Sequence, residues 1–291
     1  MKNDQWLAER FQEQRPHLRA VAYRMLGSLS EADDALQEAW LRLSRNGVDG
    51  VENLEGWLTT VVARVALNML RSRRTKREEP LGARMPDPII DRADGTNPEH
   101  EALLADSVGL ALLIVLETLS PAERLAFVLH DMFAVPFDEI APIVERSPQA
   151  TRQLASRARR RVQGERTTPD PDLHRQRDVV DAFLAAAREG DFDALVAVLD
   201  PDVVLHADFG GGVRQRLRGA EAVASQAQTY SRLGLAIHPA LINGAVGAVT
   251  TRDGRPFSVG AVTVRDGKII ELDFLADPER LAQLDLTVLG G

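Results

Sequence analysis

Cysteine is absent from this sequence of 291 residues. Its absence excludes a disulfide framework, a zinc site built on thiolates and a cysteine nucleophile. No apolar run approaches the roughly 20 residues that a membrane-spanning helix needs. Residues 1–9 are polar and charged, unlike the start of a signal peptide. We therefore expect a soluble cytoplasmic protein with no membrane partner.

Positive charge is in the minority, and the formal net charge is −8 at neutral pH. This balance argues against a protein that coats nucleic acid indiscriminately. Basic residues nevertheless gather in two places. Residues 61–77 hold six basic residues and no acidic one, and residues 141–166 hold seven arginines against two glutamates. Two basic patches on an acidic chain, which is long enough for two or three domains, predict two local contacts with DNA.

The second patch lies in residues 136–161, PFDEIAPIVERSPQATRQLASRARRR, which predict a helix-turn-helix. Apolar residues recur at helical spacing from Phe137 to Val144, and Ser147-Pro148 is typical of a helix start. A major groove about 12 Å wide admits one such helix. A basic helical face standing alone is explained equally well as solvated surface. The candidate DNA contacts are Ser147, Gln149, Arg152, Gln153, Ser156, Arg157 and Arg160.

The first patch ends a helical segment, residues 4–74, whose second helix is predicted over 31–44 and whose third is predicted over 57–74. Three stretches, YRMLGS (23–28), EADDALQEAWLRL (31–43) and WLTTVVARVALNMLRSRR (57–74), resemble the second domain of extracytoplasmic-function (ECF) sigma factors. The resemblance implies that the acidic helix docks on the clamp helices of the RNA polymerase core. It also implies that the basic helix and the loop before it melt the promoter and read its minus-ten element.

The resemblance assigns residues to both tasks. Core polymerase is expected to bind Asp33, Asp34, Leu36, Glu38 and Trp40. The melted minus-ten strand is expected to contact Arg64, Asn68, Arg71, Arg73 and Arg74. We expect this domain to occupy residues 1–75.

Residues 76–101 are rich in proline, aspartate and glycine and predict a linker. Ser120, Pro121 and Glu123 then form a capping-box pattern at the start of a helix over 121–133. With the helix-turn-helix, residues 102–166 resemble the fourth sigma domain, which reads the minus-thirty-five element. Pro142 predicts a kink or an early stop in the first helix of the motif. Two further departures from the family are Glu145, where the turn often takes glycine, and Arg146, where an apolar residue is common.

Residues 167–173 predict a second linker, and residues 174–291 predict a separate domain of helices followed by strands. The hairpin signal is Asp266-Gly267. The stretches AAAREGDFDALVAVLDPDVVLHAD, GAEAVA and VRDGKIIELDFLAD resemble the SnoaL-like, nuclear-transport-factor-2-like cone, a curved sheet around a helix with a pocket in its mouth. The expected fold is thus multidomain: two all-α sigma domains followed by an α+β SnoaL-like domain.

Sigma factors with this extension form a subfamily, and the resemblance implies contacts between its extension and the sigma core. The residues implied are Asp208, Gly210, Gly211, Gly212, Asp277, Pro278 and Arg280. A domain on a short linker has an effective concentration on the order of millimolar, so weak contacts are occupied. We expect the extension to regulate in cis.

Some SnoaL-like cones are cyclases or isomerases. His206 and Asp208 share one strand face, and Asp273 lies on a later strand, so a general base is one interpretation. The other is that these groups only bond within the strand ends.

Our main hypothesis is a non-enzymatic sigma factor that needs no cofactor or metal; it leaves a small-molecule ligand of the pocket open. The alternatives are a pocket enzyme fused to a DNA-binding module, and a regulator that binds DNA without polymerase.

Overall fold

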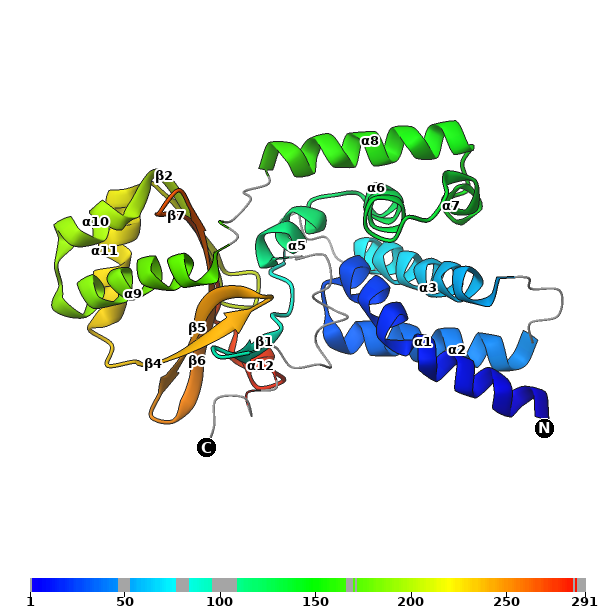
Figure 1. The fold of residues 1–291 in the computed structure, drawn as a ribbon, viewed down its shortest axis with the longest axis horizontal. Helices are drawn as coiled ribbons and strands as arrows, with labels where there is room; N and C mark the ends of the chain where they lie inside the picture. Colours follow the sequence, from blue (N-terminus) through cyan, green and yellow to red (C-terminus); the bar gives the residue numbers. More distant parts are fainter. Residues whose placement is uncertain are drawn as a thin grey trace. The chain divides into compact units, whose positions relative to one another are not determined.

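The computed structural model describes residues 2–46, 53–76, 84–95, 109–165, 170, 172–284 and 286. The chain folds into two compact units (Figure 1). The first unit is helical and consists of Met1–Pro86, Pro98–Asp106 and Leu112–Glu165. The second contains the sheet and consists of Asp87–Asn97, Ser107–Ala111 and Arg166–Gly291. Among the helices of the described residues, none is long and apolar enough to span a membrane.

Three long helices begin the first unit: α1 (Lys2–Leu26), α2 (Leu29–Asn46) and α3 (Leu54–Lys76). Each helix contacts the other two, which makes a three-helix bundle (Figure 1). Their apolar residues recur at three- and four-residue spacing, and those facing the bundle are fully buried, among them Leu18, Val62 and Leu67. The helical prediction for residues 4–74 is therefore confirmed where the chain is described.

The helices that follow are α5 (Leu110–Glu117), α6 (Pro121–Phe127), the π-helical turn η1 (Val128–Met132), α7 (Phe137–Val144) and α8 (Pro148–Glu165). The predicted capping box is confirmed: the Ser120 backbone N–H donates to Glu123 at 3.2 Å, and the Ser120 hydroxyl accepts from the Glu123 N–H at 3.4 Å. Helix α7 continues two residues beyond Pro142. It ends at Val144, and the cap residue Glu145 has a φ of 57°, in the left-handed region that usually takes glycine.

Polar contacts join the two groups of helices within the first unit. Arg124, 2% exposed, donates from Nε to the carbonyl of Arg24 at 3.0 Å and from Nη1 to Glu117 at 2.6 Å. The Arg24 guanidinium in turn lies 4.7 Å from the centre of the Phe133 ring. Gly27 has a φ of 67°, and a β-carbon there would lie 2.5 Å from the Glu117 carboxylate, so the position favours glycine. Within the first unit, the α1–α3 bundle and the helices around Arg124 therefore pack against each other.

The second unit is built on a seven-stranded sheet in the order β1-β4-β5-β6-β7-β2-β3. Neighbouring strands are antiparallel except β2 and β7, which are parallel. Helices α9, α10 and α11 lie together on one side of the curved sheet (Figure 1) and share a core with it. The elements are α9 (Leu173–Glu189), α10 (Phe192–Val198), β2 (Leu199–Asp208), β3 (Arg214–Arg218), α11 (Ala220–Ser231), β4 (Ala236–Ile242), β5 (Ala245–Arg252), β6 (Arg255–Arg265), β7 (Lys268–Leu275) and α12 (Pro278–Leu281).

The predicted hairpin at Asp266-Gly267 is confirmed, with both residues at positive φ between β6 and β7. Asn243-Gly244 and Asp253-Gly254 form two further turns of the same kind. These dipeptides favour the tight two-residue turn because its central residues need positive φ.

Both predicted linkers need correction. Ile90–Arg92 of the 76–101 segment forms strand β1, which pairs with β4 at the edge of the sheet. Two hydrogen bonds extend this pairing: the Ile89 N–H donates to the Asn243 side-chain oxygen at 3.1 Å, and the Asn243 N–H donates to the Ile89 carbonyl at 2.8 Å. In the second linker, the Asp170 N–H donates to the Val264 carbonyl at 2.8 Å. Each predicted linker is thus partly bonded to the C-terminal sheet.

Candidate functional site

Helix α8 presents one exposed polar face. The seven residues predicted to contact the minus-thirty-five element are all exposed on α8 or at its first turn. The opposite side of the helix, through Thr151, Ala155, Ala158 and Val162, is fully buried. A helical period of 3.6 residues separates these two sets cleanly. The arrangement leaves a convex, basic surface of the width that a major groove admits.

Other arginines fix α8 in position. Arg159 pairs with Asp131 at 2.5 Å, and Arg161 donates to the Thr118 carbonyl at 3.1 Å. Arg157, one of the predicted contacts, also pairs with Glu123 at 3.3 Å. Arg152 stacks over the Phe137 ring at 5.3 Å. Gln149, Gln153, Ser156 and Arg160 complete the exposed face.

On α3 the predicted minus-ten residues divide into two groups. Arg64, Asn68 and Arg71 are exposed and follow one helical face. Arg71 also lies 3.9 Å from the Glu145 carboxylate. Arg73 is turned inward instead: it donates to Glu31 at 2.9 Å and to the Leu26 carbonyl at 3.1 Å, which ties α3 to the start of α2. The side chain of Arg74 lies outside the described residues.

A hollow of about 320 Å³ lies between α1 and α2. Four of the five predicted core-binding residues line it: Asp33, Asp34, Leu36 and Trp40. Asp33 accepts two hydrogen bonds of 3.0 Å from Arg19, so its carboxylate is used in holding α1 to α2. Asp34 and Glu38 are exposed, and Glu38 pairs with Arg42 one turn later. The result is a groove with an apolar floor and a charged rim, on which Arg15 lies as well as the two aspartates.

In the second unit two of the predicted regulatory residues, Asp208 and Arg280, belong to a buried ion cluster. Arg280 donates to Asp208 at 3.3 Å and to Asp87 at 2.6 Å, and its side chain is 9% exposed. The side chain of Asp277 caps α12 and accepts from the N–H groups of Glu279 and Arg280. A β-carbon at Gly210 would lie 2.5 Å from the Asp277 carboxyl group, so the glycine allows this close approach. Pro278 opens α12, whereas Gly211 and Gly212 have nothing within 4 Å of such a β-carbon.

Asp87 is the member of this cluster that sequence reasoning missed. It lies 193 residues from Arg280 along the chain, in the segment predicted as a linker. The only local signal is its place between two prolines just before an apolar pair, Ile89-Ile90. We call the Asp87–Arg280–Asp208 cluster, together with the β1–β4 pairing, the linker clamp.

His206 forms a second charged cluster, on strands β2 and β7. Its Nδ1 lies 3.0 Å from Asp273 and 3.5 Å from Glu271. Burial by itself would lower the pKa of His206, but hydrogen bonds to the two carboxylates outweigh it and raise this pKa to about 9. Burial raises the pKa of Asp273 to about 6, against the opposing effect of the His206 hydrogen bond. A cationic imidazole between two carboxylates thus holds the parallel strands together.

The same three residues are the described candidates for a metal ion, because one ligand atom of each lies within 4.8 Å of the others. A protonated imidazole has no lone pair for a metal, so the ion-paired and metal-bound forms exclude each other.

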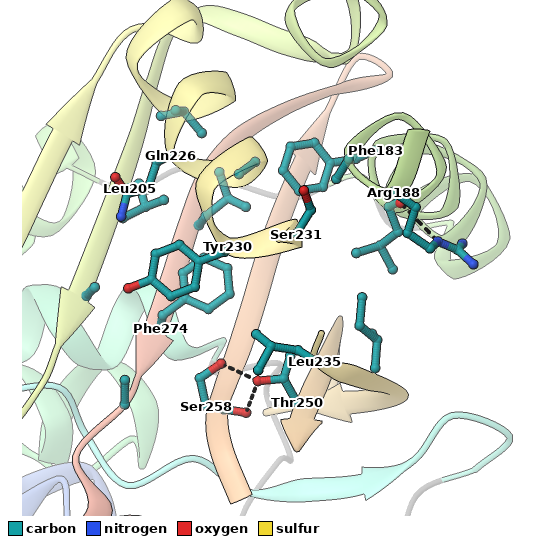
Figure 2. A pocket seen from close by; sticks show the side chains of 18 of the residues that line it. Phe183, Arg188, Leu205, Gln226, Tyr230, Ser231, Leu235, Thr250, Ser258 and Phe274 are labelled. Carbon is teal, nitrogen blue, oxygen red and sulfur yellow. Dashed lines mark hydrogen bonds between the residues drawn. The ribbon is translucent and has the colours of Figure 1, made fainter. Parts of the chain in front are cut away.

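A cavity of about 510 Å³ lies on the other face of the sheet, under α9 and α11 (Figure 2). Leu205, Ala207, Leu272 and Phe274 line it. Since neighbouring residues of a strand point to opposite faces, His206, Asp208 and Asp273 point away from it. The structure therefore separates the predicted acid–base residues from the cavity in which they would have to act.

Three family models match the chain: Sigma-70 region 2 over residues 11–76, Sigma-70 region 4 over 110–162 and the SnoaL-like domain over 180–272. SigJ, an ECF RNA polymerase sigma factor of Mycobacterium tuberculosis, is 40% identical over 251 residues, which cover 82% of this chain and 80% of SigJ. The chain belongs to the ECF sigma factors.

Further comparisons agree with this family. The crystal structure of M. tuberculosis SigJ matches this sigma factor with a TM-score of 0.75 at 35% identity, over 96% of this chain and 99% of that one. The ECF RNA polymerase sigma factor SigG of the same species is 28% identical over 263 residues, covering 80% of this chain and 70% of SigG. The expected fold, two helical sigma domains followed by a mixed α and β SnoaL-like domain, is confirmed.

Proposed function

We propose that this ECF sigma factor reads its promoter through α3 and α8, docks on core polymerase through the α1–α2 groove, and is held in check by its own C-terminal unit. Its family directs promoter recognition in transcription initiation, so the chemistry of nucleotidyl transfer belongs to the polymerase. The observation that carries the regulatory part is the linker clamp.

The DNA-reading assignment rests on exposure. Side chains that contact phosphates or base edges must be free of internal partners or able to leave them. Gln149, Gln153, Ser156 and Arg160 of α8 meet this condition, as do Arg64 and Asn68 of α3. Arg73 meets it poorly because it is bonded to Glu31 and Leu26. We assign Arg73 to holding α3 in place.

The polymerase-docking assignment rests on the groove between α1 and α2. Its apolar floor, Leu36 and Trp40, suits the apolar side chains of a partner helix, and Asp34 and Glu38 at or beside its rim suit a basic one. A clamp-helix pair with both features is the expected occupant.

The regulatory assignment rests on where the clamp holds the chain. Residues 77–109 connect the two sigma regions, and Ile90–Arg92 of that connection is a strand of the C-terminal sheet. Two promoter elements are separated along the duplex, so the two regions must move apart to bind both. The clamp fixes the segment that connects the two sigma regions, and the buried bond from Arg124 to the Arg24 carbonyl holds the regions together. Both contacts therefore stabilise the arrangement in which the two regions pack against each other. We therefore expect the clamp to oppose promoter binding.

We also propose that the C-terminal unit is not catalytic. Among the described residues that line its cavity, the charged ones are Asp181 and Arg188, both exposed. A general base needs a titratable group within hydrogen-bond reach of the substrate. The His206–Asp273 pair points away from the cavity and is an ion pair between strands.

Run-off transcription with core polymerase on genomic fragments tests the promoter-reading role, with and without residues 173–291. Transcripts that depend on this chain are expected; binding of promoter DNA that is independent of core polymerase would favour a regulator that works alone.

For the clamp, Asp87→Asn should raise output about threefold or more, because a charge-assisted bond is weakened. Asp94→Asn is the matched control: Asp94 lies in the same segment, is exposed, and pairs with Arg92 at the surface rather than with Arg280. Equal output from both variants would contradict regulation through the clamp.

A further inference from the structure

We propose that the cavity of the C-terminal unit binds a neutral, largely apolar small molecule, and that its occupancy sets the strength of the linker clamp. The second half rests on the proposed regulation in cis; the first half does not. The cavity volume of about 510 Å³ lies within the range of roughly 300–1,000 Å³ typical of small-molecule sites.

The lining decides the class of ligand. Apolar side chains from α9, α11 and the sheet form most of the wall (Figure 2). Asp181 and Arg188 are exposed, so no described charge inside the cavity is available to pair with a charged ligand. An ionised group placed there would lose its hydration without compensation. The ligand is therefore uncharged.

A few polar groups give the wall some selectivity. The hydroxyls of Thr250 and Ser258 bond to each other at 2.7 Å and are satisfied without a ligand (Figure 2). In the described part of the chain, no hydrogen bond engages the Tyr230 hydroxyl or the Gln226 amide, and both residues line the cavity. They can bond to one or two hydroxyl or carbonyl groups of the ligand.

Two residues of the cavity wall are sequence neighbours of residues at the linker clamp. Phe209 and Ala276 belong to the wall and directly flank Asp208 and Asp277. The Ala276 N–H donates to the Asp208 carbonyl at 2.7 Å, and the Asp208 carboxylate accepts from Arg280. A ligand that displaces Phe209 or Ala276 therefore moves the group that holds Arg280 against Asp87.

Strand β4 gives a second connection between the cavity and the linker clamp. Ile237 and Pro239 lie in the cavity wall, and the last three residues of the same strand, Ala240–Ile242, pair with β1. A shift of β4 caused by a ligand is thus transmitted to the pairing that pins the connecting segment.

Binding is tested on the full-length protein with two dyes that differ by one charge. N-phenyl-1-naphthylamine is neutral, and 8-anilinonaphthalene-1-sulfonate is the same skeleton with a sulfonate. The neutral dye should bind saturably at one site and about tenfold more tightly than the sulfonate. No saturable binding, or equal binding of both dyes, would overturn the ligand assignment.

Cavity-filling variants locate the site. Ala227→Trp fills the cavity from α11, and Ser231→Trp narrows it from an exposed position, where the fold tolerates a large side chain. Each should weaken binding of the neutral dye about tenfold. Ala222→Trp, exposed on the same helix and outside the cavity, is the matched control and should leave binding unchanged. Wild-type binding by both filling variants would place the dye elsewhere and overturn the proposal.

Coupling is tested by hydrogen exchange of residues 86–95 with and without saturating neutral dye. Occupancy should change exchange at Ile90–Arg92 by about threefold or more, because the pairing with β4 is strengthened or weakened. Binding with unchanged exchange would overturn the coupling. The transcription comparison of Asp87→Asn with Asp94→Asn uses no dye, so failure of the regulatory role is recognised separately.

Discussion

The arginines of α8 and Arg280 have the same side chain and opposite surroundings. Arg152 and Arg160 lie at the surface of α8, whereas Arg280 is buried between two carboxylates. An exposed guanidinium is available to a phosphate or a guanine edge, but contributes little to folding. A buried guanidinium between two carboxylates holds segments together, and cannot leave without exposing unpaired charge. Burial and ion-pair partners, rather than residue type, thus determine whether an arginine is available to bind DNA or stabilises the fold.

The largest effect is expected from Arg280→Met, which leaves the buried carboxylates of Asp87 and Asp208 without their cation. The free energy of unfolding of the C-terminal unit should fall by about 3–5 kcal/mol. Denaturant unfolding of the full-length protein measures it. Arg252→Met, an exposed arginine on β5, is the control and should stay within about 0.5 kcal/mol of wild type. Equal stability of the two variants would mean that Arg280 contributes no more to folding than an exposed arginine does.

A smaller effect is expected from reversing exposed charge in the α1–α2 groove. The double variant Asp34→Lys, Glu38→Lys should weaken binding to core polymerase by about 2–3 kcal/mol, because like charges then face each other across the docking surface. Its own unfolding should change little. A binding titration with purified core measures the effect. The same charge change at Glu189 and Asp193, exposed acids of the C-terminal unit, should leave core binding intact.

On α8, two adjacent arginines are expected to have different roles. Arg160→Ala should weaken binding of the minus-thirty-five element by about 1–3 kcal/mol and leave unfolding unchanged. Arg159→Ala should do the reverse, because Arg159 pairs with Asp131. Footprinting with holoenzyme and thermal unfolding measure the two quantities. Identical behaviour of both variants would show that the ion pair with Asp131 does not separate the two roles.

The smallest effect concerns pH. The pKa of His206 is raised to about 9, above its ordinary 6.5, so its stabilising contribution is complete below about pH 6.5 and is lost as pH rises through about 9. The difference in melting temperature between wild type and His206→Gln should therefore be positive at pH 7 and shrink towards pH 10. A constant difference over this range would mean that His206 is not a cation in the folded protein.

Much of this arrangement could be predicted from the sequence because it is local. The exposed face of α8 follows from a 3.6-residue period, the capping box from Ser120 and Glu123, and the β6–β7 hairpin from Asp266-Gly267. Whether Arg73 is exposed could not be predicted in this way, because its partner Glu31 lies 42 residues away.

Strand β1 could not be predicted from the sequence either, because its partner is also distant along the chain. Three residues beside prolines favour a loop by every local rule. They become a strand because β4 supplies an edge about 150 residues later, with Ile90 opposite Ile242. Likewise, the spacing of His206 and Asp208 places them on one strand face, but only the packing of α9 and α11 shows that the cavity lies on the other.

A double-mutant cycle read out as run-off transcription tests whether Arg280 and Asp87 act together to restrain promoter binding. Asp87→Asn, Arg280→Met and the double variant are compared with wild type on one promoter at equal holoenzyme concentration. If the clamp is one contact, each single variant raises output and the double variant raises it no further. Effects that simply add, or single variants that leave output unchanged, would contradict the claim.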